Sequence, residues 1–349
     1  MEAKNIKRRR FIGLGSLTLS TFAFPFPIVD FLTTKATLAS DSKKKNNMNN
    51  QQKFDAIIIG GSYAGLSAAM ALGRSMRNTL VIDNGKPCNR QTPHSHNFLT
   101  QDGQTPKEIA TLGKVQVEQY PTVSFHEGLA MKGAKTQEGF EITTQSGKVF
   151  TGKKLVFATG IADQMPDIEG FAECWGISVI HCPYCHGYEY RKQKTALMAN
   201  GERAFHMIPL IYNLSNELTV LTQGKADFSE EQREKLKARN VEIIEKEITI
   251  VEHQKGHIGG VIFKDGTKLK LDAMYAAIPF TQHTDIPQNL GCEMTEFGYI
   301  EVDSFQKTNI PGVYACGDNA TMMRSVANAV YQGSVAGAAL NGELAHETF

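Results

Sequence analysis

The chain of 349 residues is long enough for two to three domains of about 150 residues each, which excludes a single small module. Hydrophobic residues make up 41% of it and charged residues 21%, a balance that excludes wholesale disorder. The formal charge of +1 includes a basic excess in the first 47 residues, so the remainder is mildly acidic and nucleic acid is not an expected partner.

Residues 1–47 resemble an export signal followed by a linker. Arginines at positions 8, 9 and 10 precede Phe11, and an apolar stretch runs from Leu14 to about Phe26. A twin-arginine pair before a short apolar segment is typical of the twin-arginine pathway, which carries folded proteins, and prolines make the run too short for a stable membrane span. We expect export to the periplasm or the outer face of the membrane. The alternatives are an uncleaved anchor, or translation from Met48, which would leave the protein in the cytoplasm.

A strand–turn–helix–strand pattern over residues 54–83 predicts a dinucleotide-binding unit. The apolar run 54–59 is typical of a buried parallel strand, 66–72 favours a helix, and a second strand over 79–82 ends at Asp83. The turn reads G-x-S-x-x-G, which brings the free N–H groups of a helix to a pyrophosphate, and an acid at the position of Asp83 accepts from a ribose hydroxyl. The alternative is a glycine-rich turn that binds nothing. The candidate cofactor-binding residues are Gly60, Gly61, Ser62, Tyr63, Ala64, Gly65 and Asp83.

Cys182 and Cys185 form a Cys-x-x-Cys pair, although six cysteines are too few for a disulfide-stapled scaffold. Cysteines at this spacing can close a reversible disulfide at a helix start, where the helix dipole lowers the pKa of one thiol. With His186 the pair also fits a c-type haem attachment signature, and with His181 the set contains zinc-ligand types. Haem c is attached to unfolded protein after export, which conflicts with a pathway for folded proteins. We favour a redox dithiol over metal, haem or a structural role, and predict no metal site.

Residues 194–244 repeat the strand–helix–strand pattern, but their nucleotide fingerprint is damaged. Ala199 replaces the first glycine of the turn, and Glu202 brings a carboxylate to the helix start, where it would repel a pyrophosphate. After the second strand the chain offers Gln223-Gly224-Lys225 instead of a basic pair for a 2′-phosphate. The sequence therefore argues against NADP(H) binding in this domain.

Two further segments, with the turn at 60–65, resemble the three FAD-binding segments of flavoproteins with two dinucleotide domains. Residues 154–160 are an apolar strand ending in Ala-Thr-Gly, and residues 312–318 are another strand that ends in Gly-Asp before a helical stretch over 326–340. The resemblance implies FAD as cofactor. It places Asp318 near the ribityl and pyrophosphate groups, and Arg324, Ser325 and Val326 along the isoalloxazine ring. The other residues that it assigns to the FAD site are Asn97, Thr159, Gly160 and Gly317.

The chain from Phe54 to about Leu344 resembles the low-molecular-weight thioredoxin reductases. The resemblance implies an α/β fold of two Rossmann-like dinucleotide-binding domains, the second inserted in the first, and a homodimer. The FAD-binding domain would span residues 54–163 and 285–349, and an NAD(P)-binding-like domain with the dithiol would span residues 166–283. A thioredoxin reductase has aspartate where this chain has His186, and here the chain is more similar to the FAD-dependent dithiol oxidases of gliotoxin and holomycin biosynthesis.

This second resemblance implies that a substrate dithiol passes electrons through Cys182 and Cys185 to FAD, and then to O2 or a quinone. We expect Cys182 to be released as the more exposed thiol and Cys185 to face the flavin. His186 is the expected general acid or base because histidine titrates near neutral pH, with His181 as a second candidate. The substrate would be a small-molecule or peptide dithiol, or a thioredoxin-like protein.

Two other functions stay open. One is an NADPH-dependent, thioredoxin reductase-like disulfide reductase in the cytoplasm. The other is a flavoprotein that senses redox state by binding a partner, without turnover. The remaining cysteines, Cys88 among them, are interpreted as small buried hydrophobic residues, and His283 as incidental.

Overall fold

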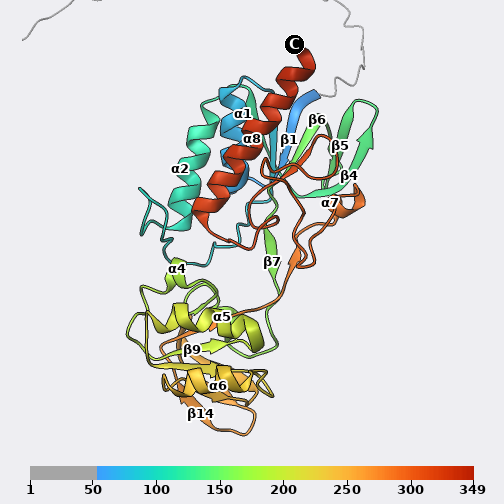
Figure 1. The fold of residues 1–349 in the computed structure, drawn as a ribbon. Helices are drawn as coiled ribbons and strands as arrows, with labels where there is room; N and C mark the ends of the chain where they lie inside the picture. Colours follow the sequence, from blue (N-terminus) through green and yellow to red (C-terminus); the bar gives the residue numbers. More distant parts are fainter. Residues whose placement is uncertain (1–52) are drawn as a thin grey trace, which may run out of the picture. The chain divides into compact units, whose positions relative to one another are not determined.

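The structure, a computed structural model, describes residues 53–349. A mixed sheet and a parallel sheet dominate it, and the chain builds most of the first, then the second, then completes the first (Figure 1). This order confirms the predicted fold class, in which one Rossmann-like domain is inserted in another. The predicted export signal at residues 1–47 lies outside the described residues. Among residues 53–349, no helix is both long and apolar enough to cross a membrane.

The first sheet has β1 near its centre, paired in parallel with β2 on one side and β6 on the other. Strand β17 pairs in parallel with β6, and β5 and β4 extend the sheet in antiparallel fashion. The apolar run of β1 is buried, as expected for a central parallel strand. The strands are β1 (Lys53–Ile59), β2 (Thr79–Asp83), β3 (Val123–Glu127), β4 (Ala130–Thr136), β5 (Gly139–Thr144), β6 (Val149–Phe157) and β17 (Val313–Ala315).

Helices α1 (Tyr63–Arg74), α2 (Pro106–Glu118) and α8 (Val326–Thr348) lie side by side on one face of this sheet (Figure 1). Helices α1 and α8 approach closely because α8 carries glycine at the contact. A Cβ atom at Gly333 would lie 2.0 Å from the carbonyl oxygen of Ala64, closer than any side chain tolerates. This contact brings the start of α8 next to the turn that precedes α1.

The second sheet is parallel, in the order β11-β10-β9-β15-β8. A capping box of Ser229 and Gln232 begins α6. An antiparallel sheet of β12, β13 and β14 adjoins it. The elements are β8 (Val179–Ile180), β9 (Thr195–Met198), α5 (Gly201–Tyr212), β10 (Leu218–Leu221), α6 (Glu230–Lys237), β11 (Glu242–Ile244), β12 (Ile248–Gln254), β13 (His257–Phe263), β14 (Lys268–Lys270) and β15 (Ala273–Ala276).

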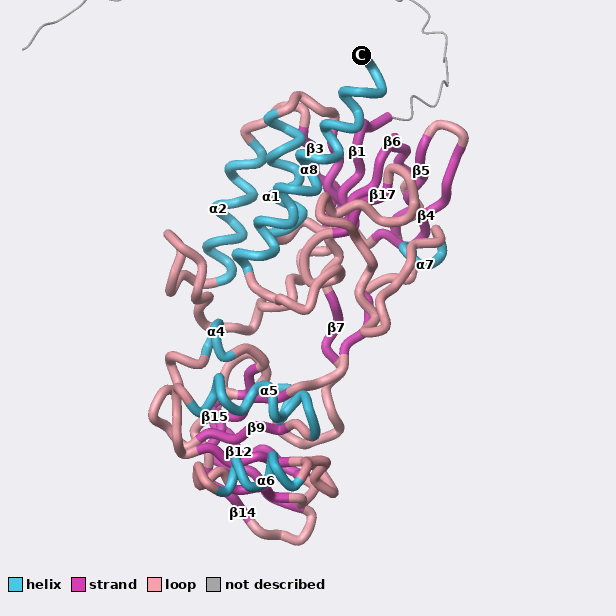
Figure 2. Tube along the Cα trace, in the orientation of Figure 1, coloured by secondary structure: helices cyan, strands magenta, loops and turns pink. Residues whose placement is uncertain are grey.

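Two short strands connect the sheets. Strand β7 (Ile161–Asp163) leads out of the first sheet, β16 (Phe280–Gln282) leads back, and the two pair in antiparallel fashion (Figure 2). Short helices α3 (Phe171–Cys174) and α4 (Pro183–His186) follow β7, and α7 (Ile286–Asn289) follows β16. Helix α4 begins directly after Cys182 and contains Cys185, so it carries the predicted dithiol.

Candidate active site

A cavity of about 580 Å³ opens where β1, β6 and β17 end. Its size lies within the range of ligand sites, and the ends of parallel strands are where such folds bind ligands. The inserted domain contributes His181, Cys185 and His186 to the lining. The predicted dithiol therefore meets the first predicted dinucleotide site in one cavity.

The turn between β1 and α1 is shaped by glycines. A Cβ atom at Gly60, whose φ is +105°, would lie 2.2 Å from the carbonyl oxygen of Ala158, and one at Gly65 would lie 1.8 Å from the carbonyl oxygen of Gly60. The Ser62 side chain makes no capping hydrogen bond, so N–H groups in the first turn of α1 stay available to a ligand. This is the backbone cradle that a pyrophosphate requires.

Asp83, at the end of β2, ties this cradle together and lines the cavity. One of its carboxylate oxygens accepts from the backbone N–H of Gly61 at 3.0 Å, and the other accepts from that of Gly85 at 3.2 Å. The carboxylate is thus held beside the turn, where it can also accept from a ribose hydroxyl, as the sequence predicts.

Most predicted site residues line this cavity, but not all. Gly65 lies beneath the turn, and Cys182 lies outside the lining, while its partner Cys185 is part of it. Asn97 is exposed and is not part of the lining, to which its loop contributes Ser95 and His96. The residues that do line it are Gly60, Gly61, Ser62, Tyr63, Ala64, Asp83, Thr159, Gly160, His181, Cys185, His186, Gly317, Asp318, Arg324, Ser325 and Val326.

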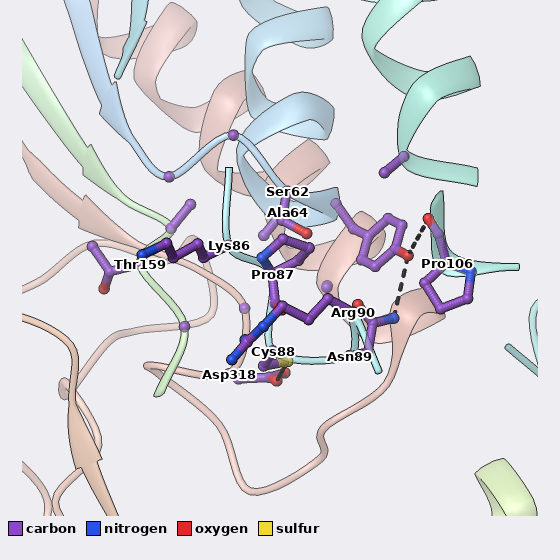
Figure 3. Close-up of a pocket in the computed structure, with 18 of the residues that line it drawn as sticks. Ser62, Ala64, Lys86, Pro87, Cys88, Asn89, Arg90, Pro106, Thr159 and Asp318 are labelled. Carbon is purple, nitrogen blue, oxygen red and sulfur yellow. Dashed lines mark hydrogen bonds between the residues drawn. The ribbon is translucent and has the colours of Figure 1, made fainter. Parts of the chain in front are cut away.

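The loop after Asp83 forms a wall of the cavity that the sequence analysis missed. Asn89 donates to the Tyr63 hydroxyl at 3.2 Å, and this hydroxyl donates to the Pro106 carbonyl at 3.1 Å, which ties the loop to α1 and α2 (Figure 3). Cys88 lies 3.6 Å from a carboxylate oxygen of Asp318, and burial raises the pKa of its thiol to about 12. Cys88 is therefore no isolated buried hydrophobic residue, because it contacts Asp318 in the cavity wall.

The cysteine pair has two electrostatically different sulfurs. The backbone N–H of Cys185 donates to Cys182 Sγ at 3.2 Å, and the Cys185 thiol also donates to it, which lowers the pKa of Cys182 and raises that of Cys185. Both side chains are half-buried. The expected difference, with Cys182 more exposed than Cys185, is therefore not found. What distinguishes them is position, because Cys185 lines the cavity and lies 3.9 Å from the carbonyl oxygen of Arg324.

We expect reduced protein to be alkylated first at Cys182. Because its pKa is lowered, its reactive thiolate persists to lower pH than that of a free cysteine, whose pKa is about 8.5. Mass spectrometry after short iodoacetamide pulses should place the half-maximal rate at Cys182 below pH 8.5. The variant Cys185→Ala removes the thiol donor and should move that midpoint upward. Faster alkylation of Cys185 in the unaltered protein would contradict this assignment.

Comparison with known proteins shows which family the chain belongs to. Residues 54–333 match the model of the pyridine nucleotide-disulphide oxidoreductases, and this range includes both sheets and the dithiol. The chain belongs to this family. Similar proteins include thioredoxin reductase tcpT of Claviceps purpurea, 33% identical over 83% of this chain and 94% of the relative, and sirT of Leptosphaeria maculans, 32% identical over 82% and 93%. The crystal structure of an oxidoreductase from Agrobacterium tumefaciens matches with a TM-score of 0.79, 36% identity, and coverage of 84% of this chain and 99% of that one.

The protein is therefore an FAD-dependent thiol–disulfide oxidoreductase similar to thioredoxin reductases. Its first dinucleotide site fits FAD, because only glycines at positions 60 and 65 allow the tight turn that leaves helix N–H groups open to a pyrophosphate. Asp83 stands at the ribose position, and the far part of the cavity reaches Cys185. Bound there, FAD would have its adenosine part near Asp83 and its redox-active ring near the dithiol.

The pKa values of His186 and His181 lie well below neutral pH, contrary to the expectation for His186. Burial lowers the pKa of His186 to about 4 and that of His181 to about 3. Both imidazoles are thus neutral at pH 7, where they can accept a hydrogen bond but cannot stabilise a thiolate as imidazolium. His181 Nε2 has no hydrogen-bond partner among the described residues. His283, read from the sequence as incidental, also lines the cavity.

The second nucleotide turn of the oxidoreductase, between β9 and α5, is closed by its own side chains. The side-chain oxygen of Asn200 accepts from the backbone N–H groups of Gly201 at 2.9 Å and Asp227 at 2.8 Å, and its amide donates to the Lys225 carbonyl at 2.9 Å. A Cβ atom at Gly201 would lie 3.4 Å from the Asp227 carboxylate, and Glu202 is at the start of the helix. Internal hydrogen bonds and two carboxylates thus surround the place where a second pyrophosphate would bind.

Proposed function

We propose that this enzyme oxidises a dithiol substrate to a disulfide through Cys182, Cys185 and FAD, with O2 or a quinone as final acceptor. The proposal rests on the turn at the start of α5, where the Asn200 side chain occupies the first N–H of the helix and ties the turn to the Asp227 loop. The carboxylates of Glu202 and Asp227 add repulsion to any phosphate there. A reductase must receive electrons from a pyridine nucleotide in this domain, whereas a dithiol oxidase needs none. The predicted export signal favours the same direction, because reduced nucleotide is scarce outside the cytoplasm.

The position of the two sulfurs indicates the order of bond changes. A substrate thiolate attacks Cys182 of the Cys182–Cys185 disulfide, forms a mixed disulfide, and releases Cys185 as a thiolate on the cavity side. The second substrate thiolate then attacks the substrate sulfur of that mixed disulfide. The product disulfide forms and Cys182 is expelled, a favourable leaving group because its pKa is lowered. The sequence analysis expected the substrate to release Cys182 first. Here Cys182 is the sulfur attacked, while Cys185 keeps its expected place on the flavin side.

The substrate loses two electrons and two protons in this exchange. His186 lines the same cavity, but its lowered pKa makes it a weak base, so it can orient a substrate thiol by accepting a hydrogen bond while the protons pass to solvent. FAD, when bound, accepts the two electrons of the reduced dithiol and transfers them to O2, giving H2O2, or to a quinone. In the thiol–disulfide exchange, the atoms that form and break S–S bonds are the two sulfurs of the substrate and those of Cys182 and Cys185.

Steady-state turnover tests this direction. With dihydrolipoamide as the dithiol in air, we expect one H2O2 for each pair of thiols lost, with no effect of added NADPH. In an anaerobic assay with a soluble quinone, reduction of one quinone for each pair of thiols lost would identify the quinone as the acceptor. The double variant Glu202→Gln/Asp227→Asn should leave this turnover unchanged, because neither carboxylate lines the cavity that contains Cys185. Consumption of NADPH coupled to reduction of an added disulfide would contradict the proposal and favour the thioredoxin reductase-like alternative.

A further inference from the structure

The buried carboxylate of Asp163, which is not part of the cavity lining, connects the flavin side of the site with the dithiol side. Asp163, the last residue of β7, accepts two hydrogen bonds from the Arg324 guanidinium, at 2.8 and 3.0 Å. The indole N–H of Trp175 donates to the same carboxylate at 3.1 Å. The side chain of Asp163 is 9% exposed and that of Arg324 is 15% exposed, so solvent screens this network weakly.

The three members of this network belong to three separate segments. Asp163 ends the strand that leads out of the first sheet, Arg324 stands just before α8, and Trp175 follows α3 in the inserted domain. The carbonyl oxygen of Arg324 lies 3.9 Å from Cys185 Sγ. The Trp175 ring lies 6.0 Å from the ring of His181, which directly precedes Cys182. The neighbours of both redox sulfurs are thus joined through one carboxylate.

We propose that Asp163 is a positioning residue that holds the dithiol against the flavin cavity. Its charge fixes Arg324, and so places the carbonyl that faces Cys185. Its third hydrogen bond fixes Trp175, and so places the segment that leads to Cys182. Without this carboxylate, Arg324 keeps only Asp318 as an ionic partner among the described residues, at 3.6 Å. This role is the same whether electrons leave or enter through the dithiol, so it stands apart from the proposed direction of the reaction.

The variant Asp163→Asn tests this role, with Asp167→Asn as the control, because Asp167 is exposed and a few residues further along the chain. In FAD-loaded enzyme without air, the limiting rate of flavin reduction by dithiothreitol should fall at least ~10-fold in Asp163→Asn, equivalent to ~1.4 kcal/mol. The dithiothreitol concentration at half-maximal rate should stay unchanged, since Asp163 lies outside the substrate's path. Asp167→Asn should behave like the unaltered enzyme.

Fluorescence gives a second readout, because Trp175 is the single tryptophan of the chain. Bound FAD quenches a nearby indole, so release of Trp175 in Asp163→Asn should raise its emission in the FAD-loaded protein. If Asp163→Asn does not fold, Trp175→Phe decides the question: it removes the indole donor, keeps a ring beside Phe171, and should slow flavin reduction without loss of FAD. Folded, FAD-loaded Asp163→Asn with unchanged rate and emission would overturn the proposal, as would an unchanged rate in Trp175→Phe.

Discussion

Replacement of Cys185 by serine is expected to lower turnover by at least ~10³-fold while FAD remains bound, and replacement of Cys182 should do the same. Residues that act as a unit lose nearly all activity when either is removed, and a serine oxygen cannot close the disulfide. FAD should remain because neither cysteine belongs to the glycine cradle at Gly60 and Gly65. Turnover is measured as thiol loss, and bound FAD by its absorbance after gel filtration.

The two variants should differ in one respect. In Cys185→Ser, Cys182 can still form a mixed disulfide that no neighbouring thiol resolves, so mass spectrometry should detect the adduct after treatment with an aromatic disulfide reagent. Cys182→Ser should give far less adduct, because Cys185 faces the flavin cavity. Cys292→Ala is the control: this thiol is buried outside the cavity lining, near Thr308, and its loss should leave turnover intact. Retained turnover in both serine variants would refute the dithiol mechanism.

Substitution of Gly65 by alanine is expected to lower the affinity for FAD by about 100-fold or more, equivalent to ~3 kcal/mol. The added Cβ atom would lie 1.8 Å from the carbonyl oxygen of Gly60, so the turn must open and its N–H groups can no longer surround a pyrophosphate. FAD affinity is measured by titration of the apoprotein, with flavin fluorescence as the signal. Circular dichroism of the apoprotein checks that the fold is retained.

Gly113→Ala is the matched control for this substitution. Gly113 also lies in a helix, α2, but a Cβ atom there would make ordinary van der Waals contact, 3.4 Å from a methyl group of Leu66. We expect unchanged FAD affinity and equal or higher stability, because alanine favours helix more than glycine. Normal FAD affinity in a folded Gly65→Ala variant would mean that the cofactor does not use this turn.

Local features of the site were readable from the sequence because their signals lie close together along the chain. The run 54–59, the glycines after it and Asp83 form one short unit, and the structure brings them together at the end of β1. The damage to the second turn was also readable from Ala199 and Glu202. The sequence could not reveal that Asn200 closes this turn, because its partner Asp227 belongs to a later loop.

The errors concern burial and distant contacts. Cys88 was taken for an isolated hydrophobic residue because its partner, Asp318, comes more than two hundred positions later. His186 was expected to titrate near neutral pH, but burial lowers its pKa to about 4. Its burial could not be deduced from the residues next to it in the sequence. The sequence also did not show that Ser95 and His96 line the cavity, because the side of an irregular loop that faces a cavity has no periodic signal.

An anaerobic titration of the purified, FAD-loaded enzyme tests the central claim most directly. Dithiothreitol and NADPH are added separately while the visible absorbance of the flavin is followed, and air is then admitted. We expect bleaching by dithiothreitol alone, recovery of the absorbance in air with formation of H2O2, and no bleaching by NADPH. Rapid bleaching by NADPH would contradict it, and would mean that the closed turn at Asn200 opens to bind a nucleotide and that the enzyme acts as a reductase.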